Sequence, residues 1–296
     1  MGMSMGILFM TITAFWWVVL GAVISNAAQK NLNLSFIQGG SAILIMLVTL
    51  PLYFFAGIDI PLPVLIALPV SGLCNYATFI FMNKAMQTGP NGLIWAMVQS
   101  AFVMPFLMGV LFFGVPCSVT RVIGLFLILA AMVMMGLVGN SKGSAGTGKM
   151  AWILFALTSY LLAGITQCSA NLPSYILPPG NSNLLNVLFR VGLGSSGFFF
   201  GYIFHGMINR KAYGWNGCMP STLIMAVTTI ASMLFTFFGL DFLAQNNAGA
   251  IGYPIVVGVS IAVFMVYTAI KLKEKLSFST LCSVLLCLAG IIVISI

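Results

Sequence analysis

Charged residues are scarce in this sequence. Only 5% of its 296 residues are charged, and only three of those are acidic: Asp59, Asp241 and Glu274. Soluble globular proteins carry about 25% charged residues, so this chain lacks the side chains that would cover a surface exposed to water. Hydrophobic residues make up 61% of the chain and the mean hydropathy is +1.13. The composition therefore indicates an integral membrane protein whose main partner is the lipid bilayer.

Residues suited to metal binding or acid–base catalysis are also few. His205 is the single histidine, and none of the six cysteines forms a C-x-x-C pair, so we expect no metal site. No two carboxylates are placed to share general acid–base work, and Glu274 lies among three lysines, which suggests pairing at the surface. We therefore expect no catalytic residues and no enzymatic activity.

One stretch resembles a nucleotide-binding loop but lacks its last element. The segment "GSAGTGK" (143–149) fits G-x-x-x-x-G-K, yet Met150 stands where the motif needs Ser or Thr to hold magnesium. The stretch also joins two apolar runs instead of a strand and a soluble helix. We expect a flexible Gly/Ser linker here and no cofactor anywhere in the chain.

The excess of basic over acidic residues indicates how the chain is oriented in a membrane. Net charge is +8, but the lysines and arginines are scattered between apolar runs instead of being clustered on one solvated face. We therefore expect no nucleic-acid partner. Scattered cations in short loops are instead the signal that orients membrane helices.

Apolar runs divide the chain into ten expected spans. A helix needs about 20 mostly apolar residues to cross a bilayer, and backbone groups in hydrocarbon must be satisfied within the helix. The predicted fold is therefore an all-α membrane protein of ten transmembrane helices. The runs cover 5–25, 35–56, 63–84, 91–114, 118–139, 150–172, 184–205, 220–241, 247–270 and 276–296.

These spans fall into two halves of five. Residues 1–139 form the first half, 140–149 a Gly/Ser linker, and 150–296 the second half. Two halves with an odd number of spans insert with opposite orientations, as in the inverted repeats of secondary transporters. An offset of 157 residues supports this, because it aligns Gly92 with Gly249 and Lys84 with Asp241.

The loop cations predict the orientation. Nine Lys and Arg residues fall on one face, whereas the other face has only Arg121, with Asp59 and Asp241 beside it. The positive face should be cytoplasmic. We expect a multi-pass protein of the cytoplasmic (inner) membrane with both termini outside.

Polar side chains within the spans are the candidate binding residues. They are costly in lipid and tend to line a cavity or pathway, although each one could instead form a hydrogen bond between helices. Several pairs are spaced by four residues and share a helix face. The candidates within the spans are Asn75, Tyr76, Trp95, Gln99, Gln167, Asn171, Asn186, Arg190 and Tyr253.

Three charged residues are further candidates for a role in binding, gating or coupling. Arg190 could pair with Asp241, bind an anionic group of a solute, or extend to the membrane interface. Asp241 is the candidate gate or proton carrier, which would make protons a partner. Lys84 is the counterpart of Asp241 in the aligned halves and is a candidate gating residue that could instead anchor the cytoplasmic edge.

The segment "FGLDFLAQNNAGAIGYP" (238–254) interrupts the apolar pattern. We expect it at the extracellular mouth, where the ninth span begins. Asn246 and Asn247 join Tyr253 there as candidate solute contacts.

The spans together resemble a known family. The stretches "GPNGLIWAMVQSAFVMPFLMGVLFFG" (89–114), with Pro105 partway along, and "KLKEKLSFSTLCSVLLCLAGIIVI" (271–294) resemble the drug/metabolite transporter superfamily of EamA-like ten-helix transporters. In the first half, Val115-Pro116 replaces the family's acidic residue. Residues 5–44 are similar to the rhamnose and glucose/ribose uptake branch, which also has outside termini.

The resemblance implies a secondary transporter or facilitator that moves a small polar metabolite, such as a sugar, by alternating access. The alternatives are an exporter of amino acids or drug-like compounds, and a membrane scaffold without transport. The sequence leaves the oligomeric state open, with a homodimer among the options.

Overall fold

A computed structural model shows a helical bundle. It describes residues 2–52, 60–114, 118–141, 148–177, 183–215, 217–245, 252–274 and 277–295, and these residues form helices and no strand. The helices are α1 (Gly2–Gln29), α2 (Leu34–Thr49), α4 (Leu62–Thr88), α5 (Asn91–Gln99), α6 (Val103–Phe113), α7 (Val119–Ser141), α8 (Gly148–Ile176), α9 (Leu184–Ile208), α10 (Met219–Gln245), α11 (Gly252–Lys271) and α12 (Phe278–Ser295). Short 3₁₀ turns occupy Leu50–Leu52 (η1), Ser100–Phe102 (η2) and Arg210–Tyr213 (η3).

The expected all-helical membrane fold is confirmed at this level. Within the described residues, eight segments are long and apolar enough to cross a membrane, and shorter apolar helical stretches lie at Val119–Ala131 in α7 and Phe278–Val293 in α12. Large apolar side chains such as Leu111, Phe112 and Phe278 are exposed on the outside of the bundle, where lipid would cover them.

The expected linker is shorter than its composition suggests. Helix α7 continues to Ser141 and α8 begins at Gly148, so both ends of the 140–149 segment are helical. Residues 142–147 lie outside the described part of the chain.

The segment 91–114 is not one continuous helix. The turn η2 separates α5 from α6. Pro105 explains the position of this break, because a proline removes one backbone N–H and its ring crowds the carbonyl four residues earlier, which is Ala101. Ser100 Oγ donates a hydrogen bond to the Ala96 carbonyl at 2.8 Å, which also accepts the Ser100 backbone N–H.

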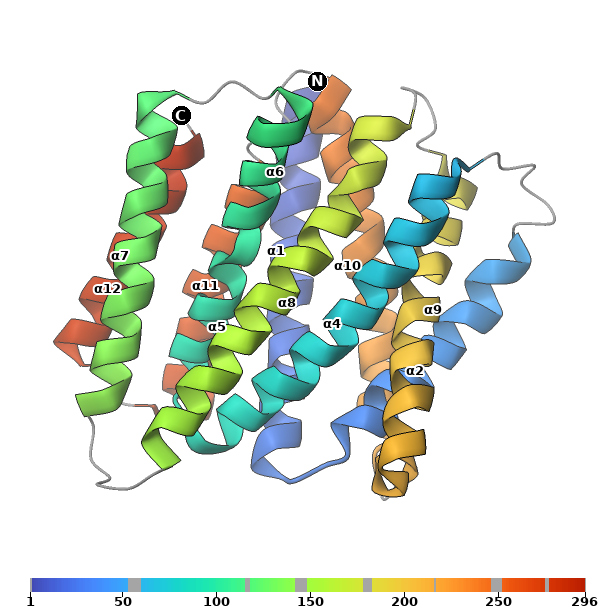
Figure 1. The fold of residues 1–296 in the computed structure, drawn as a ribbon, viewed down its shortest axis with the longest axis horizontal. Coiled ribbons are helices and arrows are strands. Elements are labelled where there is room, and N and C mark those ends of the chain that lie inside the picture. The colour runs from blue at the N-terminus through green and yellow to red at the C-terminus, as the bar shows by residue number, and fades with distance from the viewer. Residues whose placement is uncertain are drawn as a thin grey trace.

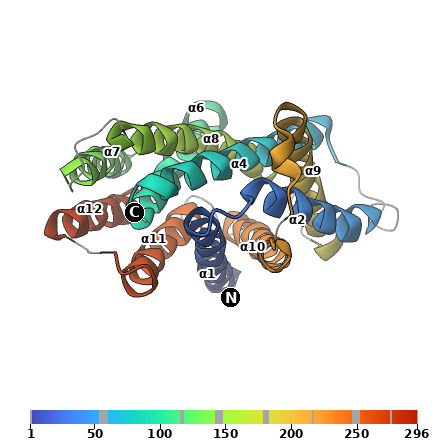
Figure 2. The same ribbon diagram turned by 90° about the horizontal axis from the view of Figure 1, so that it is seen from below.

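The helices are arranged in two layers. Seen along the helix axes, α7, α8 and α4 form one row and α12, α11, α1 and α10 the other (Figure 2). Helix α4 packs on α8 and α9, while α10 packs on α1 and α2, and α7 packs on α12. Both chain ends lie at the same end of the bundle (Figure 1).

Glycines permit the closest helix contact. A Cβ on Gly72 of α4 would collide with the Gly194 carbonyl oxygen of α9, and a Cβ on Gly197 would collide with the Pro69 carbonyl oxygen. The backbones of α4 and α9 therefore touch directly at this crossing.

Candidate functional site

A cavity lies between the two layers. Its volume is about 120 Å³, several times the roughly 10–15 Å³ that one water molecule requires. Helices α1, α4 and α5 from the first half and α8, α9, α10 and α11 from the second half line it. A solute in this cavity would therefore contact both halves of the chain.

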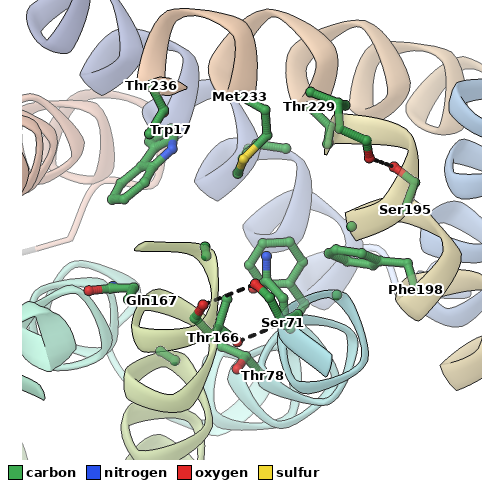
Figure 3. Close-up of a pocket in the computed structure, with 18 of the residues that line it drawn as sticks. Trp17, Ser71, Thr78, Thr166, Gln167, Ser195, Phe198, Thr229, Met233 and Thr236 are labelled. Atoms are coloured by element: carbon green, nitrogen blue, oxygen red, sulfur yellow. Dashed lines mark hydrogen bonds between the residues drawn. The ribbon is translucent and has the colours of Figure 1, made fainter. Parts of the chain in front are cut away.

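Polar side chains line both walls of the cavity. Figure 3 shows Trp17, Met233 and Thr236 across the cavity from Thr166 and Gln167. Hydrogen bonds between α4 and α8, where the two helices cross, hold part of the wall that carries the hydroxyl groups. Ser71 Oγ donates to the Thr166 carbonyl at 2.9 Å, and Thr166 Oγ1 donates back to the Ser71 carbonyl at 3.4 Å. Gln99 Nε2 reaches Ser260 Oγ at 3.4 Å and thereby links α5 to α11.

Aromatic rings form much of the remaining wall. The lining rings are Trp17, Phe79, Trp95, Phe198, Phe237 and Tyr253. Trp95 packs against Phe264, with ring centroids 4.8 Å apart, and this contact restrains its indole. Flat rings on several sides of a polar cavity suit a solute with apolar faces and polar edges.

Among the described residues, Arg190 is the only charged one that lines this cavity. Its side chain is 2% exposed, and its guanidinium carbon lies 4.0 Å from the ring centroid of Phe237 on α10. Nη1 lies 3.7 Å from Asp241 Oδ2, which makes an ion pair too long for a hydrogen bond. Nε and Nη2 are buried and have no hydrogen-bond partner among the described residues.

Two further lining residues bury polar atoms in the same way. Trp95 Nε1 and Gln167 Oε1 have no hydrogen-bond partner in the described part of the chain. Leaving such a group unpaired costs about 1–3 kcal/mol, so each of these groups needs an explanation. Gln38 on α2 is also unpaired but does not line the cavity. Three of the unpaired residues converge on one cavity, which is the arrangement expected of a ligand site.

Six of the predicted site residues line the cavity. They are Asn75, Trp95, Gln99, Gln167, Arg190 and Tyr253. Trp95 and Gln99 share one face of α5, as their spacing predicts. Of the roles left open for Arg190, the pairing with Asp241 is present, and it joins α9 to α10.

Other predicted residues lie elsewhere. The Tyr76 hydroxyl hydrogen-bonds with Ser35 and with His205 Nδ1, at 2.8 Å from the latter, and so links α4 to α2 and α9. Asn171 and Asn186 are buried but do not line the cavity. Asn246 and Asn247 lie outside the described residues.

Lys84 lies near the C-terminal end of α4. Its ammonium is 5.6 Å from the ring centroid of Phe81 and 5.7 Å from that of Phe155. The residue is exposed, does not line the cavity, and contacts the ends of α4 and α8.

The sequence analysis omitted several residues of the site. Trp17 could have been found from the Trp16-Trp17 pair in the middle of a predicted span. The lining hydroxyls of Ser71, Thr166, Ser195, Thr229 and Thr236 gave little signal. Serine and threonine can satisfy themselves on a carbonyl of their own helix, so they are unremarkable in a membrane span.

Glu274 differs most from its expected role. Its carboxylate accepts hydrogen bonds from Asn91 N at 2.8 Å, Asn91 Nδ2 at 2.9 Å and Gly92 N at 3.2 Å. It therefore caps the start of α5, and Ser25 Oγ extends this cluster by donating to Asn91 Oδ1 at 3.1 Å. Backbone N–H groups at a helix start have no partner within the helix, and together with the helix dipole they stabilise a carboxylate placed there.

No group of three or more His, Cys, Asp or Glu side chains suited to a metal ion occurs among the described residues. No protein-family model and no curated protein matches this chain.

Proposed function

We propose that this protein is a secondary transporter or facilitator of a small polar metabolite in the cytoplasmic membrane. The observation that carries the proposal is the cavity between the layers, where Trp95, Gln167 and Arg190 bury polar atoms without partners. Such atoms gain most from a bound polar solute. A sugar is the first solute class to test, because hydroxyls would meet the amides and its ring faces would meet the aromatic side chains.

The packing pattern supports ten spans in two inverted repeats. In such a repeat, α1, α2, α4, α5–α6 and α7 would correspond to α8, α9, α10, α11 and α12. The contact of α4 with α8 then corresponds to that of α10 with α1, and the contact of α4 with α9 to that of α10 with α2. The contacts α2–α9 and α7–α12 correspond to themselves. A two-fold axis that relates the two halves would exchange the helix contacts in this way. Inverted-repeat transporters bind their solute between the two repeats, and the cavity is lined by helices of both halves.

Charge supports the proposed orientation. Helices α1, α9 and α11 end away from the chain termini (Figure 1). Lys271 is the last residue of α11, and Lys30, Arg210, Lys211 and Lys273 follow the ends of these three helices. The positive end would face the cytoplasm, which puts both termini outside. A reporter fused to Ile296 tests this: an outside signal is expected, and a cytoplasmic signal would favour the exporter alternative.

Flux into vesicles tests the transport proposal. Purified protein in liposomes would be offered labelled sugars and amino acids, with and without a proton gradient. We expect saturable flux of at least one solute above that of protein-free liposomes. No flux with any solute in either direction would favour the scaffold alternative.

A matched pair of variants on α8 localises the path. Thr166 lines the cavity, whereas Thr158 lies eight residues earlier and outside it, with its hydroxyl on the Leu154 carbonyl at 2.9 Å. We expect Thr166→Val to reduce flux several-fold and Thr158→Val to leave it within about twofold of the wild-type value. Equal effects would remove the cavity from the proposed path.

A further inference from the structure

The guanidinium of Arg190 offers one complete edge to a ligand. Nε and Nη2 lie on the same edge of the planar group and form the fork that binds a carboxylate with two parallel hydrogen bonds. These are the two buried nitrogens without a partner, whereas Asp241 lies against the remaining nitrogen, Nη1. The ion pair with Asp241 thus leaves the carboxylate-binding edge unused.

The surroundings hold this guanidinium in place. The Phe237 ring covers one face of the group, and Asp241 fixes one corner from the next turn of the same helix, α10. Lysine could not reproduce this arrangement, because an ammonium has no fork and no flat face for stacking. Neither Phe237 nor Asp241 supplies a hydrogen bond to Nε or Nη2.

The charge of the cavity limits the ligand to a small anion. In the described part of the chain Arg190 is the only charged lining residue, and Asp241 already lies beside it. A phosphate dianion would need more positive charge than one partly neutralised guanidinium provides. A single carboxylate matches both the charge and the fork.

The rest of the wall recognises hydroxyls. Trp95 Nε1 is an unpaired donor and Gln167 Oε1 an unpaired acceptor, so together they suit a group that both accepts and donates hydrogen bonds. Thr166 and Thr236 add hydroxyls, and the aromatic rings add flat apolar contacts. This combination fits a polyhydroxylated carbon skeleton better than a purely aliphatic acid.

We propose that the cavity binds a small hydroxylated monocarboxylate, of the sugar-acid class, with its carboxylate on Nε and Nη2 of Arg190. This inference rests on the proposed function, since it assigns the solute to the same transport cavity. Arg190 is then the residue that selects an acid over its neutral analogue.

Thermal unfolding with matched probes tests the selection. Purified protein in lipid nanodiscs would be titrated with D-glucuronate against D-glucose, D-gluconate against D-sorbitol, and L-lactate against propane-1,2-diol, at constant ionic strength. We expect at least one of the hydroxy acids to raise the unfolding temperature in a saturable way and its neutral analogue to bind at least tenfold more weakly. A preference for the neutral analogues, or no stabilisation by any of the three acids, would overturn the proposal.

Variants of Arg190 identify the residue responsible. We expect Arg190→Gln to remove the preference for the acid, and Arg190→Lys to keep the charge attraction but weaken binding about tenfold or more. Lys271→Gln removes an exposed cation away from the cavity and should bind like the wild type. If Arg190→Gln unfolds in the nanodisc, the test rests on Arg190→Lys alone. Undiminished binding of the acid by Arg190→Lys would contradict a carboxylate held by two parallel hydrogen bonds to Nε and Nη2.

Flux measurements separate this inference from the proposed function. Flux of neutral sugars with no acid preference would retain the transporter and reject the carboxylate. Arg190-dependent binding of an acid without flux of any solute would retain the binding site and reject transport.

Discussion

A buried arginine is a costly group in a membrane bundle. Arg190 is 2% exposed in a helix long and apolar enough to span a membrane, and its nearest anion is Asp241 at 3.7 Å. Removing one partner of a buried ion pair leaves the other charge without compensation, which typically costs about 3–5 kcal/mol, whereas removing both costs much less. The two side chains therefore stabilise the bundle as a pair.

A double-mutant cycle measures this coupling. We expect Asp241→Asn to destabilise the protein by about 3 kcal/mol, and the added Arg190→Gln to restore a large part of that loss. Denaturation in detergent micelles would give the three free-energy differences. Simple additivity of the two changes would show that the pair contributes no coupling.

Asp241 is also the residue through which a proton gradient would act. It is the only acidic residue described within the long apolar helices, and it lies against the cation that we assign to the solute. We expect Asp241→Asn to abolish gradient-driven accumulation while leaving solute exchange, with Asp241→Glu retaining part of the accumulation. Continued concentration of solute by Asp241→Asn would show that coupling uses another group or that the protein is a facilitator.

Sequence reasoning found the charged and amide residues of the site because such groups are rare in membrane spans. Arg190, Gln99 and Gln167 each stood out against their apolar surroundings. It could not separate Gln167, which lines the cavity, from Asn171, one turn further on and away from it. The two residues share one face of α8, so the distinction depends on how far the cavity extends along the helix axis, which spacing within one helix does not determine.

The helices themselves were largely predictable, because membrane thickness fixes how long an apolar helix must be. The broken segment around Ser100–Phe102 was signalled only by Pro105. The contact of α4 with α9 was not predicted, since the sequence gives no measure of how closely two glycine-bearing helices approach. The distance between α4 and α9 is set by how the two helices pack.

The glycine crossing predicts a sharp difference between two alanine substitutions. Gly197→Ala would push its new methyl into the Pro69 carbonyl, whereas Gly258→Ala on α11 would make ordinary contacts with Ile291 Cγ2 at 3.6 Å and Leu288 Cδ2 at 3.9 Å. Overpacking costs about 1–3 kcal/mol, and rigid backbone leaves little room to relax. We expect thermal unfolding to show a clear loss for Gly197→Ala and almost none for Gly258→Ala; similar values would contradict the close approach.

The cap on α5 gives a second test at this scale. Glu274→Ala removes three hydrogen bonds to Asn91 and Gly92, and we expect it to cost about 1–2 kcal/mol. Glu274→Gln keeps one acceptor oxygen and should lie between alanine and the wild type. Lys271→Ala, in the last turn of α11, is the control for a change at this end of the bundle. If Glu274→Ala unfolds like the control, the cap adds no stability.

At the scale of the whole molecule, the essential feature is one cavity shared by two layers. The division into two halves stays a prediction from the span count and the charge bias, and the cavity could not be predicted from the sequence. It depends on α1 and α10 facing α4 and α8, and its lining residues on these two helices, among them Trp17, Met233 and Thr236, were not predicted from the sequence. Solute would have to reach this cavity from each side of the membrane in turn.

Cysteine accessibility from the two sides tests alternating access most directly. Thr166→Cys would be introduced after replacing the six native cysteines, and oriented vesicles would be treated from either side with a membrane-impermeant thiol reagent. We predict labelling from both sides, slowed in each case by a bound solute. Labelling from one side only, or labelling that solute leaves unchanged, would contradict a transport cavity between the two halves.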